Sequence, residues 1–243
     1  NHLDELNYSF GLKDKFKKKI LKILIKLTYN NFDSIITNSK ESSKELSKFI
    51  GTKVSTIYNP IKFRNIKIIQ RKKKKYLNIL NIGRLERQKD HITLIKAIKI
   101  LTKKIKVKLK IIGSGSQYSF LKEYIKNYGI KKNVKIIRET RNVKKFFLNA
   151  DLFVSTSLYE GFPNVLVESI IHNVPVISSN CKSGPKEILV SNNSKNLFTI
   201  KDFQELSKKI NYFYYNKREF NKNNFKIKKN LNNFHYKKII KQF

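Results

Sequence analysis

Residues 77–115 have the sequence LNILNIGRLERQKDHITLIKAIKILTKKIKVKLKIIGSG, and this stretch decides the fold. It begins and ends with runs rich in large apolar residues, 77–82 and 107–112, which are separated by a helical stretch over 90–104. Apolar runs of this kind, rather than a strict apolar–polar alternation, indicate strands that are buried on both faces. We therefore predict two parallel strands of a sheet that is covered by helices on both sides.

The same alternation continues along the chain and defines the fold class as α/β. Further strands are predicted at 134–137, 151–155 and 174–178, and further helices at 116–128, 142–149, 163–172, 202–216 and 219–243. Parallel strands joined by right-handed crossovers form a Rossmann-like domain, in which ligands bind beyond the carboxyl ends of the strands. The loops at those ends are therefore where chemistry is expected.

The N-terminal part of the chain has a different pattern. A basic amphipathic helix is predicted over 12–29, and it fits either a surface helix packed on a sheet or a helix that lies on a membrane. Ser39 is a plausible N-cap for a second helix that runs to residue 50. Short strands are predicted at 33–37 and 54–58, the latter followed by an Asn59–Pro60 turn. Residues 61–76, which include the basic run 71–75, are predicted to be a linker.

Composition limits the class of protein. The 243 residues carry 53 Lys plus Arg against 17 Asp plus Glu, a formal net charge of +36, yet 40% are hydrophobic, which argues against a disordered chain. The charge fits either a compositional bias toward Lys, Ile and Asn or attraction to an anionic membrane or nucleic acid. The single Cys181 excludes an intramolecular disulfide and favours a reducing compartment. No apolar run is long enough to span a bilayer.

Two of the strand-end loops are rich in glycine. In the first, Gly83 allows a tight turn, and Arg84 and Lys89 place two cations at the edge of the sheet, an arrangement that suits a diphosphate. The second loop, Gly113-Ser-Gly115, is half of a dinucleotide fingerprint. The third glycine of that fingerprint is replaced by Tyr118, so hydride-transfer chemistry is only weakly supported.

The loop at 157–168, SLYEGFPNVLVE, carries the strongest signal. Pro163 fits the first turn of a helix whose free amides and dipole would attract a phosphate. Glu160 precedes this helix and Glu168 lies within it, and a carboxylate can accept both hydroxyls of a sugar diol. A fourth loop, Ser183-Gly184-Pro185-Lys-Glu, presents a second backbone turn before a helix at the same edge of the sheet.

Together these motifs resemble the nucleotide-sugar half of glycosyltransferase family 4, a retaining family with the GT-B fold. The matching pieces are, in order, Gly83-Arg84-Leu with Gln88-Lys89, Ile111-Ile-Gly113-Ser-Gly115, Ala150-Asp151-Leu-Phe-Val, the E-x₇-E element Glu160–Glu168, Pro175-Val176, and Gly184-Pro-Lys-Glu187. The subgroup most similar over 155–187 builds bacterial surface polysaccharides or lipid-linked oligosaccharides.

The resemblance implies a role for each matching residue. Arg84 and Lys89 would hold the donor diphosphate, Glu160 the transferred sugar and Glu168 the ribose, while Arg138 would lie near the base. We count Glu160, Arg84 and Lys89 as catalytic candidates. The full set of candidate donor-binding residues is Gly83, Arg84, Lys89, Gly113, Arg138, Glu160, Gly161, Phe162, Asn164, Val165, Leu166 and Glu168. The donor would be a UDP- or GDP-sugar, and neither a metal nor another cofactor is expected.

The resemblance also implies a division of the chain. Residues 1–60 would be the end of an acceptor-binding N-terminal Rossmann-like domain, 61–76 the linker, 77–216 the nucleotide-sugar-binding domain and 217–243 a C-terminal helix. Because the chain opens with Asn1 instead of Met, we expect it to lack its true N-terminus. His2 is a candidate for a histidine that the family places near the acceptor, and Asn173 and Asn196 replace turn glycines, which Asn tolerates at positive φ.

The implied activity is transfer of a sugar, with retention, to a glycan or lipid-linked hydroxyl acceptor, although this fragment alone is expected to be inactive. The enzyme would be cytoplasmic, with its basic helix favouring a peripheral position on the inner membrane. Two alternatives stay open. One is a GT-B epimerase or phosphorylase, although no pyridoxal-lysine motif is visible. The other is a non-catalytic membrane- or nucleic-acid-binding protein, although no base-stacking motif is recognisable.

Overall fold

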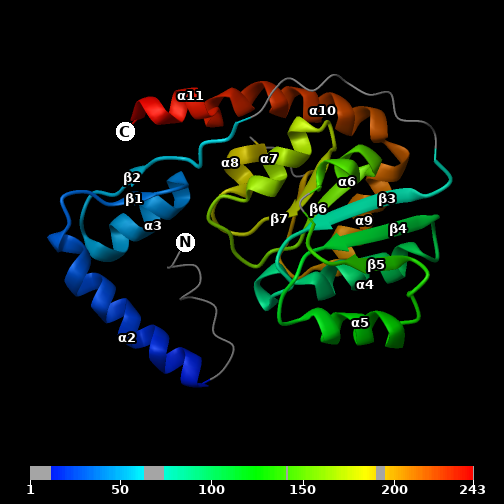
Figure 1. Ribbon diagram of the computed structural model, residues 1–243, viewed down its shortest axis with the longest axis horizontal. Helices are drawn as coiled ribbons and strands as arrows, with labels where there is room; N and C mark the ends of the chain where they lie inside the picture. The colour runs from blue at the N-terminus through cyan, green and yellow to red at the C-terminus, as the bar shows by residue number, and fades with distance from the viewer. Residues whose placement is uncertain (1–11, 63–73, 141, 190–194, 243) are drawn as a thin grey trace.

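The computed structural model describes residues 12–62, 74–140, 142–189 and 195–242. Its main feature is a six-stranded, all-parallel sheet (Figure 1). The strands are β3 (Leu77–Ile82), β4 (Val107–Ile112), β5 (Val134–Ile137), β6 (Leu152–Ser155), β7 (Val176–Ser179) and β8 (Leu197–Phe198). Their order, β5-β4-β3-β6-β7-β8, is that of a doubly wound Rossmann fold, and it reverses between β3 and β6.

Helices cover both faces of this sheet, as the sequence predicts. Their bounds are α4 His91–Leu101, α5 Tyr118–Asn127, α6 Lys144–Asn149, α7 Asn164–Ile171, α8 Pro185–Leu189, α9 Phe203–Tyr215 and α10 Lys217–Asn230. Side chains of α4, α5 and α9 pack in one hydrophobic core, and those of α6, α7 and α8 pack in the other. Helix α10 contributes to both, with Phe220 in the first core and Ile227 in the second. Figure 1 shows α4 and α5 below the strands, with α7 and α10 above them.

Consecutive strand residues point into opposite cores, which explains the apolar runs. Ile79 and Val154 belong to the first core, whereas their neighbours Leu80 and Phe153 belong to the second. The exception is β4, in which the side chain of Lys110 is exposed. Apolar and basic residues alternate in the first part of this strand, so the prediction that it is buried on both faces is wrong for Lys110. Lys110 lies 5.8 Å from the centre of the Phe146 ring.

The N-terminal elements form a smaller unit with its own two-stranded parallel sheet. They are α2 (Leu12–Thr28), the 3₁₀ turn η1 (Tyr29–Asn31), β1 (Ile36–Thr37), α3 (Lys40–Ile50) and β2 (Ser55–Thr56). Ser39 caps α3 as predicted, because its side chain accepts a hydrogen bond from the Ser42 amide. The two strands are shorter than the predicted 33–37 and 54–58. Their hydrophobic core centres on Ile25, Leu46 and Ile50.

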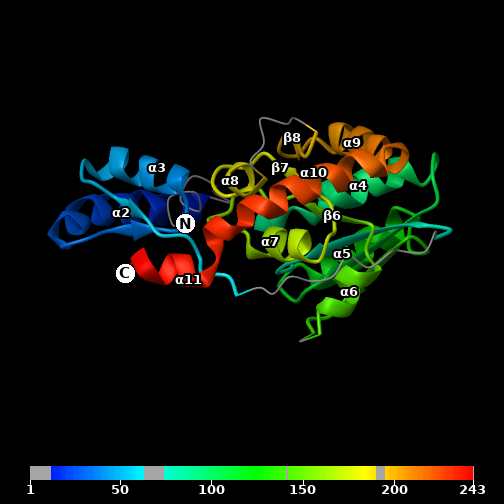
Figure 2. The ribbon, with the colours of Figure 1, turned by 90° about the horizontal axis from the view of Figure 1, so that it is seen from above.

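The C-terminal segment returns to this N-terminal unit, and here the predicted single helix over 219–243 is wrong. After α10 the chain forms η3 (Leu231–Phe234), extends at His235, and continues as α11 (Tyr236–Ile239) and η4 (Ile240–Gln242). The break exists because Ile61 pairs with His235 in a parallel bridge. Figures 1 and 2 both place α11 beside the N-terminal elements.

The two asparagines that replace turn glycines behave differently. Asn173 adopts a positive φ of 57°, as expected for a residue in a glycine position. Asn196 does not; its side chain instead donates a hydrogen bond to the Val176 carbonyl over 2.6 Å. Most of the predicted linker, residues 63–73, and the candidate His2 lie outside the described residues. The boundaries 1–60, 61–76, 77–216 and 217–243 therefore stay predictions.

Candidate donor-binding site

The candidate site lies where the loops after β3 and β6 meet, at the point where the strand order reverses. Backbone and side-chain hydrogen bonds join the two loops. The Leu158 amide donates to the Gln88 carbonyl over 2.8 Å, and the Gln88 side-chain amide donates to the Tyr159 carbonyl over 2.8 Å. The Thr156 hydroxyl donates to the Lys89 carbonyl, also over 2.8 Å. These contacts fix the position of Lys89 relative to the loop that carries Glu160.

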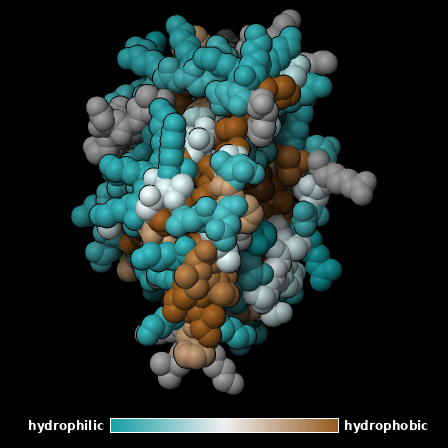
Figure 3. All heavy atoms as spheres, turned by 90° about the vertical axis from the view of Figure 1, so that its left-hand side faces the viewer, coloured by the Kyte–Doolittle hydropathy of each residue, from teal (hydrophilic) through white to brown (hydrophobic). Residues whose placement is uncertain are grey.

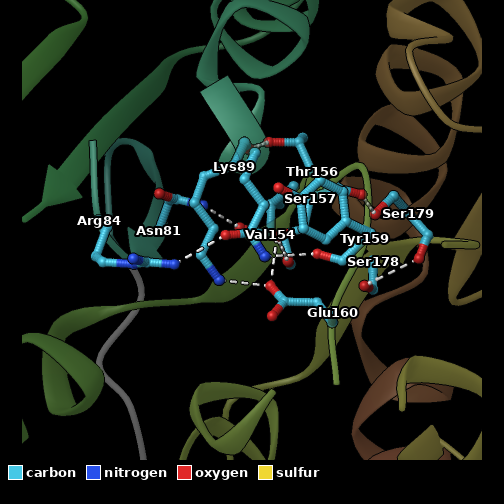
Figure 4. A network of polar contacts seen from close by, with 12 residues as sticks. Asn81, Arg84, Lys89, Val154, Thr156, Ser157, Tyr159, Glu160, Ser178 and Ser179 are labelled. Atoms are coloured by element: carbon cyan, nitrogen blue, oxygen red, sulfur yellow. Dashed lines mark hydrogen bonds and ion pairs between the residues drawn. The ribbon is translucent and has the colours of Figure 1, made fainter. Parts of the chain in front are cut away.

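Lys89 and Glu160 form an ion pair at the centre of this site (Figure 4). Lys89 Nζ lies 2.5 Å from Glu160 Oε1, and the two side chains are only 17% and 10% exposed. The Ser157 hydroxyl donates a second hydrogen bond to Glu160 Oε1 over 2.6 Å. An incoming phosphate or sugar hydroxyl would therefore compete with a partly desolvated charge pair, which is stronger than a surface pair.

Arg84 supplies a second cation to the same loop. Its side chain is exposed, and its guanidinium donates to the Gln88 side-chain carbonyl over 3.0 Å. Gln88 thus holds both Arg84 and the Tyr159 backbone. Figure 4 shows the charged ends of Arg84 and Lys89 directed to the same side of the loop, as binding of a diphosphate requires.

The backbones of the two glycine loops are in direct contact. A Cβ atom added to Gly113 would lie 1.9 Å from the Gly83 carbonyl oxygen, and one added to Gly115 would lie 2.6 Å from the Leu85 carbonyl oxygen. The sequence identified Gly113 as part of half a dinucleotide fingerprint and as a candidate donor-binding residue, but it indicated no contact with Gly83. The structure shows that this position requires glycine, because the loops after β3 and β4 touch there.

Helix α7 presents its N-terminus after Pro163, and the first amides of a helix lack partners within it. Asn164 is exposed, whereas Val165 is half-buried and Leu166 fully buried. The Asn164 side chain is thus accessible to a ligand, whereas Leu166 could approach a ligand only with its backbone groups. The Leu166 amide donates to the Pro163 carbonyl over 3.0 Å, so it is already engaged in the turn.

Glu168, one turn further along α7, is half-buried. Burial raises the pKa of its carboxyl above the usual value, and none of the described residues pairs with it. A half-buried carboxylate without a protein partner gains most from a ligand that donates hydrogen bonds to it. The geometry is therefore compatible with the ribose role that the resemblance implies.

Phe162 and Arg138, two other predicted residues, have different surroundings. The Phe162 ring is buried and lies 5.6 Å from the Tyr58 ring and 5.0 Å from the Phe234 ring, so this side chain is part of the core and only its backbone and that of Gly161 could contact a donor. Arg138 follows β5, two strands from β3, and its exposed guanidinium lies 5.5 Å from the centre of the Tyr118 ring.

Two features of the site were not predicted. The first is Ser157, whose contact with Glu160 could have been suspected only from the Ser-x-x-Glu spacing. The second is His91, which is buried with an Nε2 atom that has no hydrogen-bond partner, and whose pKa burial lowers to about 4. His91 borders a cavity of about 470 Å³ that is also lined by Glu86, Asp90, Phe120, Leu158 and Lys201.

The comparison with known proteins agrees with this fold. The chain belongs to the glycosyl transferases group 1 family, whose model matches residues 62–232. The matched region includes every strand of the six-stranded sheet and every candidate donor-binding residue.

Curated relatives share this region at about one third identity. An uncharacterised glycosyltransferase of Methanocaldococcus jannaschii is 32% identical over 218 residues, which are 84% of this chain and 51% of the relative. An N-acetylgalactosaminyltransferase of Campylobacter jejuni, named for a diphospho-undecaprenol acceptor, is 32% identical over 182 residues, or 73% of this chain and 49% of the relative. The chain thus spans about half the length of these relatives.

Solved structures show the same GT-B fold. S. aureus TarM, determined in complex with fondaparinux, α-GlcNAc-glycerol and UDP, has a TM-score of 0.81 at 22% identity, over 93% of this chain and 45% of TarM. Anabaena HepE, determined with UDP-glucose, has a TM-score of 0.81 at 21% identity, over 91% of this chain and 65% of HepE.

Proposed function

We propose that this chain is the donor-binding part of a glycosyltransferase that transfers a sugar from a UDP- or GDP-sugar to a hydroxyl acceptor with retention of configuration. The observation that carries the proposal is the Lys89–Glu160 pair at the sheet's switch point, with Arg84 on the same loop. One charge of this pair suits a phosphate and the other suits a sugar hydroxyl. Membership of the group 1 family supports the same reaction class.

In this proposal the cations act on the leaving group. The bond between the sugar's anomeric carbon and the β-phosphate oxygen breaks, and a bond from that carbon to the acceptor oxygen forms on the same face. Negative charge develops on the diphosphate, where Arg84, Lys89 and the first amides of α7 would stabilise it. The proton of the acceptor hydroxyl leaves with the diphosphate. No metal is required by this scheme, and the site is expected to work without one.

Glu160 and Glu168 would bind the two sugars of the donor. Glu160 is held by Lys89 and Ser157, which keep its carboxylate oriented for hydroxyls of the transferred sugar. We do not assign it as a covalent nucleophile. Glu168 would accept the ribose hydroxyls. A GT-B epimerase would share this donor site, so measurement of a new glycosidic product, rather than nucleotide release alone, distinguishes the two activities.

The proposed acceptor is a glycan or a lipid-linked oligosaccharide, and the proposed location is the cytoplasmic face of a membrane. The C. jejuni relative is named for such a lipid-linked acceptor. No described helix combines the length and the apolar character that crossing a bilayer needs. An amphipathic helix on the membrane surface is the alternative form of attachment.

Helix α2 has the surface for such attachment. Figure 3, which faces this side of the molecule, shows hydrophobic side chains gathered among hydrophilic ones. The exposed apolar residues of α2 are Phe16, Ile20, Leu21, Ile23, Leu24 and Leu27. Lysines flank them at 17, 18, 19, 22 and 26. We expect vesicles that contain anionic lipid to bind the chain, and Leu27→Asp to weaken that binding; sedimentation that is indifferent to anionic lipid would remove the membrane from the proposal.

The decisive experiment is titration of the chain with UDP and GDP by calorimetry. Arg84→Gln is expected to weaken binding by about tenfold, because one charge-assisted contact is lost. Arg87→Gln is the matched control, since Arg87 is also an exposed arginine of the segment after β3 but lines the cavity beside His91, which Arg84 does not line. Equal effects of both variants, or unchanged binding in Arg84→Gln, would contradict the site. RNA binding that survives moderate salt would instead favour a nucleic-acid-binding protein.

A further inference from the structure

The N-terminus of α3 meets the segment around the start of α8, and a carboxylate on each side accepts hydrogen bonds from backbone amides of the other side. Glu187 accepts the Lys40 amide at Oε2 over 3.1 Å and the Glu41 amide at Oε1 over 3.2 Å, although it lies about 147 residues further along the chain. In return, Glu41 Oε2 accepts the Ser183 amide over 2.8 Å. Glu187 thus satisfies first-turn amides of α3 that a helix leaves without internal partners.

Two more contacts belong to the same junction. The Ser42 hydroxyl donates to the Ser183 hydroxyl over 2.9 Å, and both side chains are buried. Lys182 forms an exposed ion pair with Glu45 at the rim. An exposed pair of this kind contributes little. The buried part of the junction is therefore the Ser42–Ser183 contact, and the bonds between backbone amides and carboxylates surround it in half-buried to exposed positions.

The loop on the α8 side of the junction presses against the donor loop. Ser183 and Gly184 both have positive φ, 65° and 93°. A Cβ atom added to Gly184 would lie 2.4 Å from Pro163 Cδ and 2.9 Å from the Gly161 carbonyl oxygen. Gly161 directly follows Glu160. A displacement of Ser183 and Gly184 would therefore be transmitted to the segment that carries the candidate sugar-binding carboxylate.

Tyr58 makes a second connection between Glu187 and the donor loop. Its hydroxyl donates to Glu187 Oε2 over 2.7 Å, while its ring packs against Phe162 and against Phe234, with centroids 5.6 Å and 4.9 Å away. Burial raises the pKa of the Tyr58 phenol, and the hydrogen bond to Glu187 and its negative charge raise it further. The phenol therefore stays protonated and keeps its role as a donor.

We propose that Glu187 is a positioning residue, which couples the α3 N-terminus and Tyr58 to the donor loop 157–164 and so sets the placement of Glu160. A role of Glu187 in catalysis rests on the proposed function, whereas its coupling to the donor loop concerns the fold alone. Nothing in the junction requires Glu187 to touch a substrate. Its two oxygens are occupied by two backbone amides and one phenol.

Hydrogen–deuterium exchange, followed by mass spectrometry on the full chain, tests the coupling without any assay of activity. In Glu187→Ala we expect about tenfold faster exchange in the segment 40–46, because a bond to a carboxylate is lost, and faster exchange also in the segment 157–166. Tyr58→Phe keeps the ring but removes one donor, so it should speed exchange in 157–166 to a smaller extent. Glu219→Gln is the control, because Glu219 lies on α10, away from the junction, and forms an exposed ion pair with Lys195.

The outcomes separate coupling from simple capping. Faster exchange in both segments supports the proposal. Faster exchange confined to 40–46, or no change in either segment, overturns it, because Glu187 would then be only a helix cap. If Glu187→Ala does not fold, Glu187→Gln and Tyr58→Phe, which retain the shape of the side chains, are judged by the same criterion.

Addition of UDP to the wild-type chain separates this proposal from the proposed function. If donor binding and the junction are coupled, UDP slows exchange in 157–166 and also in 40–46, and Glu187→Gln reduces the second effect. Protection by UDP that is confined to 157–166 in both proteins counts against the coupling. Absence of any protection by UDP contradicts the donor site, while the comparison of variants without nucleotide still decides the role of Glu187.

Discussion

Lys89 Nζ lies 2.5 Å from Glu160 Oε1, so the cation proposed for the diphosphate and the carboxylate proposed for the sugar neutralise each other before a donor arrives. A donor must compete for both groups. The pairing keeps two partly buried charges from standing alone, which would be costly. The pairing also orients both side chains. A donor could then replace Glu160 with a phosphate as the partner of Lys89, and replace Lys89 with a sugar hydroxyl as the partner of Glu160.

The pair predicts opposite effects for its two members. Lys89→Gln should weaken UDP binding by about 10- to 100-fold, because a charge-assisted contact to phosphate is lost. Glu160→Gln frees Lys89 and should leave UDP affinity unchanged or higher, while sugar transfer by the complete enzyme falls by at least about tenfold. Calorimetry and a product assay check the two arms. Weaker UDP binding in both variants would argue against separate roles.

Glu168 predicts a preference for ribose. The wild-type chain should bind UDP more tightly than 2′-deoxy-UDP by about fivefold or more, since one hydroxyl–carboxylate bond is lost, and Glu168→Ala should abolish the difference. Binding should also weaken as the pH falls through the raised pKa of Glu168, because a protonated carboxyl accepts hydrogen bonds poorly. If Glu168→Ala keeps the preference, the ribose lies elsewhere.

The contact between the glycine loops predicts a difference between two alanine substitutions. Gly113→Ala places Cβ 1.9 Å from a backbone oxygen that cannot move aside, and it should lower the free energy of unfolding by about 1–3 kcal/mol or more. In Gly83→Ala the three atoms nearest to the new Cβ are Lys89 side-chain atoms at 3.4–3.6 Å, so the free energy of unfolding should change by less than about 1 kcal/mol. Urea unfolding compares them, and equal values would contradict the predicted close approach.

His91 predicts a pH dependence of stability. Burial lowers its pKa from 6.5 to about 4, so between these values the unfolded chain binds the proton that the folded chain does not. Stability is therefore full above pH 6.5 and falls as the pH drops toward 4, with a loss on the order of 3 kcal/mol. His91→Gln, which does not titrate, should show a shallower loss over this window in urea unfolding. Parallel curves for the two proteins would refute the assignment.

Much of the fold was predictable because its signals are local. The strand bounds 77–82, 107–112 and 134–137 agree with the prediction, since apolar runs bounded by turns report burial in a sheet. Ser39 acts on the amide of Ser42, three residues away, and Asn173 needs only its own positive φ. The prediction for Asn196 was wrong because its side chain bonds to a neighbouring strand rather than to its own turn.

The candidate site was predictable in part. The sequence by itself determined the α/β class, the order of the strand-end loops and the residue types available for a diphosphate and a sugar, because these follow from local hydrophobic patterns and motifs. Tertiary structure alone decided that Lys89 pairs with Glu160, that Gly113 touches Gly83 and that Glu187 caps α3. It also decided the break at His235, which exists because Ile61 pairs there. Contacts between distant segments depend on how the packed strands and helices place them in space, and no local pattern encodes that placement.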